Sequence, residues 1–180
     1  AGGLLLMLGW AYLALGLFES EHRFDLRMAG KFMATALVVS LLEEWLFRGL
    51  LLDAMLRSAR KWVALLFVTF FFALVHFLKP PGTIMLSDAD VNLTTGFWMI
   101  GQIFIHFGNP VFIAAEFATL FAVGWVLGWA RLRTSSLWLG IGLHAGWVFS
   151  YELYKYHTFM PKRYTLDLFL PYIGQSLKNG

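Results

Sequence analysis

The residues of this chain that could do chemistry begin with two adjacent carboxylates, Glu43 and Glu44, inside an otherwise apolar run. Arg48 follows four positions after Glu44, so on a helix the two side chains share a face and can form an ion pair. Glu43 comes one residue earlier and points about 100° away from that pair. Ionisable residues inside a membrane are costly and mark functional sites by default. We therefore expect Arg48 to neutralise Glu44 and to leave Glu43 available for chemistry.

Two histidines lie in later apolar runs, His76 in Phe72-Ala-Leu-Val-His76 and His144 in Gly140-Ile-Gly-Leu-His144. A carboxylate with two imidazoles suits hydrolysis. The carboxylate takes a proton from water, one imidazole helps to hold that water, and the other can stabilise the oxyanion. The sequence contains no cysteine, so it has no thiolate nucleophile, disulfide or thiolate ligand for a metal.

The elements that must position these groups are apolar helices. The chain has 180 residues, of which 59% are hydrophobic and 14% charged, and its mean hydropathy is +0.66. This composition is typical of a multi-span membrane protein. The formal charge of +3 is better explained by membrane topology than by nucleic-acid binding, because no basic patch is interleaved with aromatic residues. We expect an all-α polytopic transmembrane bundle of about five to seven segments around a polar cavity in mid-membrane, folded as a single domain over residues 1–180.

Segment lengths refine this expectation. The first apolar run has no basic residues before it, so we expect a span and not a cleaved signal peptide. A mixed-charge segment over 19–31 follows it, either a connector or an amphipathic segment at the membrane interface. Basic turns at 57–61 and 131–133 favour the cytoplasmic side. Segments 96–107 and 166–173 are apolar but short for a crossing. The five clear spans are 2–18, 32–55, 62–78, 111–130 and 135–154.

The order of these motifs resembles a known family. Glu43-Glu44-x-x-x-Arg48, then Phe72-x-x-x-His76, then His144 is similar to the CPBP family of type II CAAX prenyl proteases (Rce1-type) and bacteriocin-processing or immunity proteins, also called Abi proteins. The resemblance covers about residues 40–150. Each motif alone is weak, but all three in order and each inside an apolar segment form a specific pattern.

The resemblance implies an intramembrane glutamic-type endopeptidase with no required metal or cofactor. It implies that Glu43 activates the water, that His76 works with Glu43 on that water, and that His144 serves the oxyanion. Glu44 and Arg48 would be the supporting pair, and Phe72 the packing aromatic. The implied partners are membrane lipids and a membrane-anchored peptide or protein substrate, prenylated or carrying a sorting signal, and no nucleic acid. We expect an integral protein of a prokaryotic cytoplasmic membrane; the oligomeric state stays open.

One position departs from the family pattern. The family usually carries Asn or another polar residue four positions after the last histidine, where this chain has Val148, which cannot donate a hydrogen bond. An oxyanion partner would have to come from elsewhere. Glu116 either bonds to another helix or lines the cavity, and Gly124 and Gly128 are expected helix-packing positions. The oxyanion alternatives are Trp147, Ser150, Asn109 and Tyr151.

Other functions remain open on the sequence alone. A zinc hydrolase with Glu43, His76 and His144 as ligands is one alternative, although the His-Glu-x-x-His signature is missing. A non-catalytic membrane immunity or scaffold protein is another, and Val148 favours it. A transporter is disfavoured because no two repeated halves are evident. A calcium loop at 88–99 is disfavoured because Leu93 replaces the required glycine.

Overall fold

The computed structural model describes residues 2–16, 18–20, 25–77, 92, 94–98, 101 and 110–159. The described part is almost entirely helical, which confirms the all-α class. A short helical turn at 95–98 is described between α4 and α6. The elements in chain order are α1 (Gly2–Ala14), β1 (Glu19–Ser20), α2 (Leu26–Glu44), the π-helix η1 (Trp45–Leu51), α3 (Leu52–Leu56), α4 (Lys61–Phe77), α6 (Pro110–Thr134), α7 (Trp138–His157) and β2 (Thr158–Phe159).

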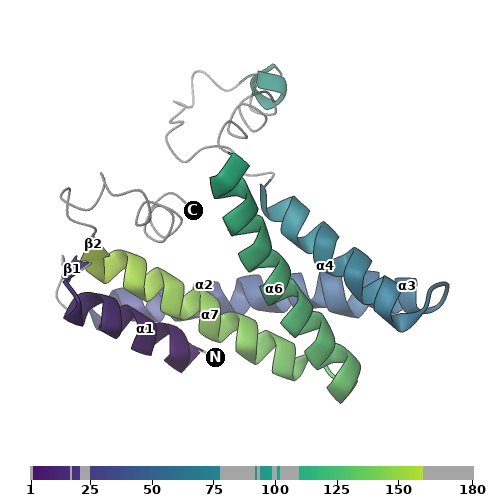
Figure 1. Ribbon diagram of the computed structural model, residues 1–180, viewed down its shortest axis with the longest axis horizontal. Helices are drawn as coiled ribbons and strands as arrows, with labels where there is room; N and C mark the ends of the chain where they lie inside the picture. Colours follow the sequence, from purple (N-terminus) through teal and green to yellow (C-terminus); the bar gives the residue numbers. More distant parts are fainter. Residues whose placement is uncertain are drawn as a thin grey trace.

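The helices form two packed pairs that meet at α6 and α7 (Figure 1). In the first pair, α2 packs antiparallel to α7, since Phe32 lies against Tyr156 and Glu44 lies against His144. Helix α1 covers another side of α7. In the second pair, α4 packs against α6, and α6 also contacts α7. Residues from three separate motifs can therefore reach one region.

Helix α2 begins earlier than the sequence indicated. We expected a connector over 19–31, but the helix starts at Leu26, so the second half of that segment is helical. The reason is the N-cap Asp25, whose side chain accepts a hydrogen bond from the backbone N–H of Arg27 at 2.8 Å. Two of the remaining connector residues form β1, which pairs antiparallel with β2, Glu19 opposite Phe159.

The segment expected as one regular helix over 32–55 has a wider middle. After Glu44 the backbone enters the π-helix η1 and returns to an α-helix at Leu52. Single π-helical segments inside α-helices often occur at functional sites. Here the π-helix follows Glu44 directly and contains Arg48. Hydropathy patterns do not register such a widening, so the sequence predicted the helix but not its interruption.

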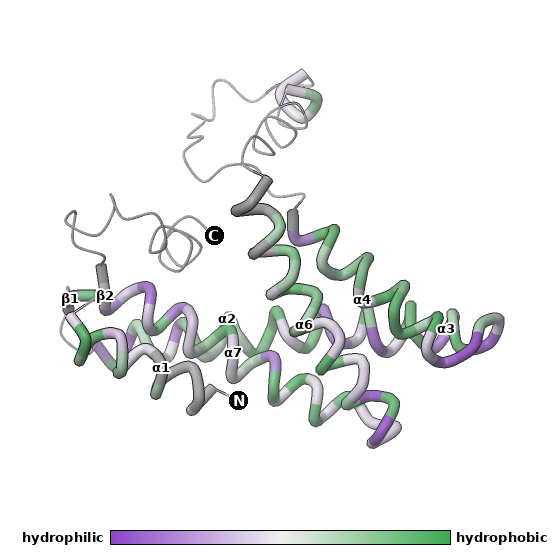
Figure 2. The backbone as a smooth tube through the Cα atoms, in the orientation of Figure 1, coloured by the Kyte–Doolittle hydropathy of each residue, from purple (hydrophilic) through white to green (hydrophobic). Residues whose placement is uncertain are grey.

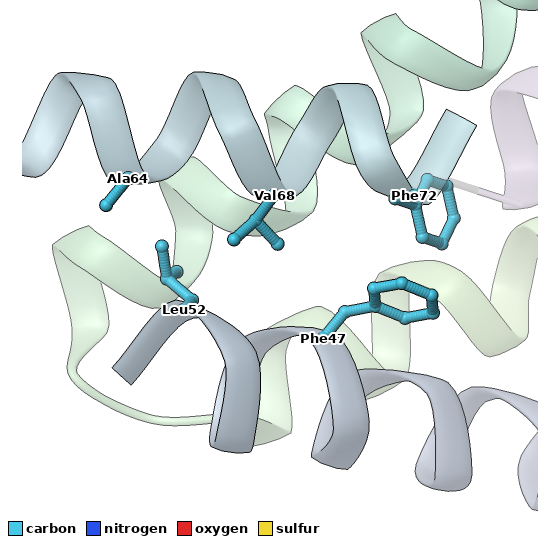
Figure 3. Close-up of a cluster of buried hydrophobic side chains, with 5 residues drawn as sticks. All are labelled: Phe47, Leu52, Ala64, Val68 and Phe72. Carbon is cyan, nitrogen blue, oxygen red and sulfur yellow. The ribbon is translucent and has the colours of Figure 1, made fainter. Parts of the chain in front are cut away.

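The apolar core lies between this widened segment and α4. Phe47 and Leu52 pack against Ala64, Val68 and Phe72 of α4, as Figure 3 shows. This cluster fixes η1 and α3 against α4 and holds Phe72 close to the charged residues.

Two glycines of α6 allow α4 to approach closely. A Cβ on Gly124 would lie 3.0 Å from Cδ1 of Phe72, and a Cβ on Gly128 would collide with Cδ1 of Leu65. The expected packing role of both glycines is confirmed.

Apolar residues occur along every long helix (Figure 2), and many large apolar side chains are exposed as well as buried. Helices α1, α4, α6 and α7 lie within or close to the segments predicted as spans. No helix in the described part of the chain is both long enough and apolar enough to cross a lipid bilayer. The expectations for 78–91 and 160–180, including the short apolar segment 166–173, lie outside the described residues, and only 96–98 and 101 of the segment 96–107 are described.

Candidate active site

Glu44 and Arg48 form the buried ion pair that their spacing predicted. Nη1 of Arg48 donates to Oε1 of Glu44 at 2.8 Å, and the two side chains are 0% and 1% exposed. Nη2 of Arg48 donates to the carbonyl oxygen of Gly124 at 3.0 Å. The guanidinium also lies over the ring of Phe72, 4.4 Å from its centroid. A charge buried so completely needs all of these partners.

His144 connects this pair to the neighbouring carboxylate. Its Nδ1 lies 3.1 Å from Oε1 of Glu44, and a carboxylate oxygen can only accept, so Nδ1 carries the proton. Its Nε2 lies 3.8 Å from Oε2 of Glu43. The sequence did not predict the contact with Glu44, because residues on different helices have no spacing that would reveal it.

His76 approaches Glu43 from α4. Its Nδ1 lies 2.8 Å from the carbonyl oxygen of Phe72 and therefore donates to it. In the neutral ring Nε2 then carries a lone pair, and it lies 3.5 Å from Oε2 of Glu43. The Phe72 ring packs between the two imidazoles, 4.3 Å from His76 and 6.2 Å from His144 by centroids. Phe72 is thus a packing aromatic in the structure.

These distances bring three distant motifs to one oxygen. Nε2 of His76 and Nε2 of His144 both face Oε2 of Glu43. Glu43 is the most accessible of the three side chains, 28% exposed against 15% and 7%. The exposed part of this side chain is elsewhere, because Oε2 itself is buried. A carboxylate with imidazole nitrogens this close is the set of groups that general-base hydrolysis requires. The catalytic roles of the three residues remain predictions.

Gly140 leaves the space that the Glu44 carboxylate occupies, and the sequence alone did not indicate this. A Cβ on Gly140 would lie 2.8 Å from Oε2 of Glu44, so only glycine leaves room for that carboxylate. Gly142 differs, because among the described residues nothing lies within 4 Å of the position its Cβ would take. The signal for Gly140 was its place one turn before His144 on the same helix face.

Most of the oxyanion alternatives lie on α7 close to Val148. Val148, Trp147 and Tyr151 are half-buried on α7. The Ser150 hydroxyl donates to the carbonyl oxygen of Gly146 at 2.7 Å, a bond within its own helix. Asn109 and the side chain of Glu116 lie outside the described part of the chain.

Helix α6 holds Arg48 at two points. The carbonyl oxygen of Gly124 accepts a hydrogen bond from the Arg48 guanidinium. In addition, Nε of Arg131 donates to the backbone carbonyl oxygen of Arg48 at 3.5 Å. Nη2 of Arg131 also lies 3.1 Å and 2.9 Å from the two carboxylate oxygens of Asp53. Gly124 and Arg131 are seven residues apart and share one face of α6. Helix α6 therefore contacts both the side chain and the backbone of Arg48 in the π-helical segment.

Within the described ranges, no group of three or more His, Asp or Glu side chains is arranged to hold a metal ion.

The fold and the site together define a class: a helical protein with a candidate hydrolytic centre of one half-buried carboxylate and two imidazoles. Residues 26–150 match the family described as type II CAAX prenyl endopeptidase Rce1-like, and the chain belongs to this family of membrane proteases. The match begins before the core at 40–150 that the motifs indicated, and it includes the N-terminal half of α2. No curated protein and no solved structure matches the chain.

Proposed function

We propose that the protein is an intramembrane endopeptidase that hydrolyses a peptide bond in a membrane-anchored peptide or protein, with a water activated by Glu43. The observation that carries the proposal is the approach of His76 and His144 to a single oxygen of Glu43, at 3.5 Å and 3.8 Å. Family membership supports peptide hydrolysis as the reaction, and a prenylated CAAX-type tail is the first substrate class to test.

The reaction follows from the geometry. Glu43 takes a proton from a water held against Nε2 of His76, whose lone pair accepts the water's second hydrogen bond. The water oxygen bonds to the scissile carbonyl carbon, and the electrons of the C=O double bond move to the carbonyl oxygen. When the C–N bond breaks, the leaving nitrogen takes the proton from Glu43. The products are a carboxylic acid and an amine.

His144 is proposed to stabilise the oxyanion. Its Nδ1–H is already donated to Glu44, so Nε2 donates only when the ring carries both protons. In that form His144 is a cation between two carboxylates. The positive charges of His144 and Arg48 then balance the negative charges of Glu43 and Glu44. The buried pair Glu44–Arg48 thus sets the ring orientation as well as the local charge.

A membrane setting is part of the proposal. Support comes from the mean hydropathy of +0.66 and from large apolar side chains on the surface. On α4 these include Trp62 at 51% exposed and Leu66 at 53%, and on α2 Val38 at 59%. Contiguous exposed apolar surface marks membrane or protein contact. Lipid would cover these side chains in the proposed protein.

The decisive experiment is Glu43→Gln in purified protein reconstituted in lipid vesicles. Glutamine keeps the size of the side chain but cannot take the proton, so cleavage of a membrane-anchored reporter peptide should fall by roughly 10²–10⁴-fold. The matched control is Glu152→Gln on α7, which should cleave like the wild type. Unchanged cleavage by Glu43→Gln would refute the proposed mechanism.

The same assay separates the alternatives. Prenylated and unprenylated versions of the reporter test whether a lipidated tail is needed. A chain that retains its biological effect when Glu43, His76 and His144 are all replaced would be a non-catalytic immunity or scaffold protein.

A further inference from the structure

The hydroxyl of Ser40 is a buried polar group with no hydrogen-bond partner among the described residues. Ser40 is 0% exposed. Other hydroxyls on these helices bond back to their own backbone, as Ser150 does to Gly146 O and Thr134 to Ala130 O. Ser40 makes no such bond. Burying an unpartnered hydroxyl costs stability, and natural proteins accept such costs mainly at functional sites.

Ser40 lies one helical turn before the two carboxylates Glu43 and Glu44. It precedes Glu43 by three residues and Glu44 by four, so all three side chains occupy neighbouring positions on α2. This part of α2 packs on α7, where Glu44 meets His144.

The register of the two helices places Ser40 level with Val148. Glu44 lies against His144, and Phe32, three turns earlier on α2, lies against Tyr156, three turns later on α7. The two helices rise equally per residue, so one turn before Glu44 corresponds to one turn after His144. Val148 occupies that position on α7 and presents no donor.

Burial does not remove Ser40 from the chemistry. Oγ of Ser40 is shielded from solvent to the same degree as Oε2 of Glu43, the oxygen that both imidazoles face. A substrate that reaches Oε2 of Glu43 has to uncover a buried atom, so burial alone does not distinguish Ser40 from the proposed base.

We propose that Ser40 is the second hydrogen-bond donor to the scissile carbonyl oxygen, beside His144, and that it supplies from α2 the donor that Val148 cannot supply from α7. The hydroxyl stays intact and shares its hydrogen with the oxygen as negative charge develops there. This inference rests on the proposed endopeptidase function.

The test is Ser40→Ala, with kcat, KM and Tm measured on the same preparation. Loss of one oxyanion donor should lower kcat by roughly 10²-fold while KM changes little. Tm should stay the same or rise, because the variant removes an unsatisfied buried group. A purely structural hydroxyl would not produce this combination of lower kcat and retained stability.

The matched control is Thr69→Val on α4. Thr69 carries the other buried serine or threonine hydroxyl without a hydrogen-bond partner among the described residues, two turns before His76. Its replacement should leave kcat at the wild-type value.

A double variant tests whether Ser40 and Val148 occupy equivalent positions on the two facing helices. The double variant Ser40→Ala/Val148→Asn moves the donor to α7 and should recover at least ten-fold of the lost kcat. Wild-type kcat in Ser40→Ala, or a parallel loss of kcat and Tm, would overturn the inference and leave the proposed function standing. An inactive wild type would overturn both, and cleavage that depends on Glu43 but not on Ser40 would overturn the inference alone.

Discussion

Nδ1 of His144 and Nη1 of Arg48 share one acceptor, Oε1 of Glu44, at 3.1 Å and 2.8 Å. The supporting carboxylate therefore does more than hold its own helix. It fixes the proton on Nδ1 of His144 and leaves Nε2 directed toward Glu43. A buried ion pair on α2 and η1 thus holds a proton on Nδ1 of the His144 ring on α7.

Glu44→Gln should cost both stability and activity. The amide carries no charge, so Arg48 is left buried without its counter-ion, and breaking one side of a buried ion pair costs about 3–5 kcal/mol. Thermal unfolding in detergent measures this loss, and the cleavage assay measures the accompanying fall in kcat. Glu43→Gln supplies the contrast, since it should remove activity with little change in Tm. Equal Tm values for the two variants would contradict the division of roles.

Asp53→Asn should have a much smaller effect on stability. The Asp53 side chain is 40% exposed and that of Arg131 is 20% exposed, and solvent screening limits such a pair to about 1 kcal/mol or less. Tm should therefore fall far less than in Glu44→Gln. The charge swap Asp53→Arg/Arg131→Asp is the matched control for the pair. If Asp53→Asn lowered the free energy of unfolding by several kcal/mol, the Asp53–Arg131 pair would contribute more than its solvent exposure allows.

Gly140→Ala should disturb the site through a single methyl group. The new Cβ would lie 2.8 Å from Oε2 of Glu44, so the carboxylate has to move away from His144. We expect a loss of about 1–3 kcal/mol together with reduced kcat. Gly142→Ala is the matched control on the same helix, because no described residue comes within 4 Å of its added Cβ. Similar behaviour of the two alanine variants would disprove the packing argument.

His76→Phe should keep the fold and lose the chemistry. A phenyl ring can still pack on Phe72, but it offers no nitrogen to the water beside Glu43. Loss of this acceptor should reduce kcat by roughly 10²-fold. In a parallel His76→Ala variant, added imidazole should restore part of the activity. Failure of both effects would remove His76 from the proposed mechanism.

Chelators test the zinc alternative. The proposed mechanism uses only side chains and water, so EDTA or 1,10-phenanthroline should leave cleavage unchanged, and purified active protein should contain far less than one metal ion per chain. Activity that disappears on chelation and returns with zinc would support the metal mechanism instead.

The sequence predicted the Glu44–Arg48 ion pair but not the π-helical form of the segment that contains Arg48. The four-residue spacing of Glu44 and Arg48 determines their pairing on any helix-like segment, and it held even though Arg48 lies in a π-helix. The helix-packing glycines of α6 were also predictable, because a small residue at four-residue spacing permits close approach.

What could not be predicted depends on contacts between helices. Gly140 and the bond from His144 to Glu44 arise from the register of α2 against α7, which no local pattern encodes. The start of α2 was misjudged because charged residues suggested a connector, although Asp25 carried the capping signal. The π-helix was missed because a one-residue widening leaves the hydropathy profile unchanged.

The strand pair β1–β2 has a consequence for how the chain is made. Glu19 pairs with Phe159 and Ser20 with Thr158, so an early segment is joined to one that is synthesised much later. Translation of the intervening residues 21–157 takes on the order of ten seconds. Throughout that interval α1 lacks its partner α7, whose Tyr154 packs against Gly9. The N-terminal helix is therefore made first but reaches its contacts with α7 only after nearly all of the described chain has been synthesised.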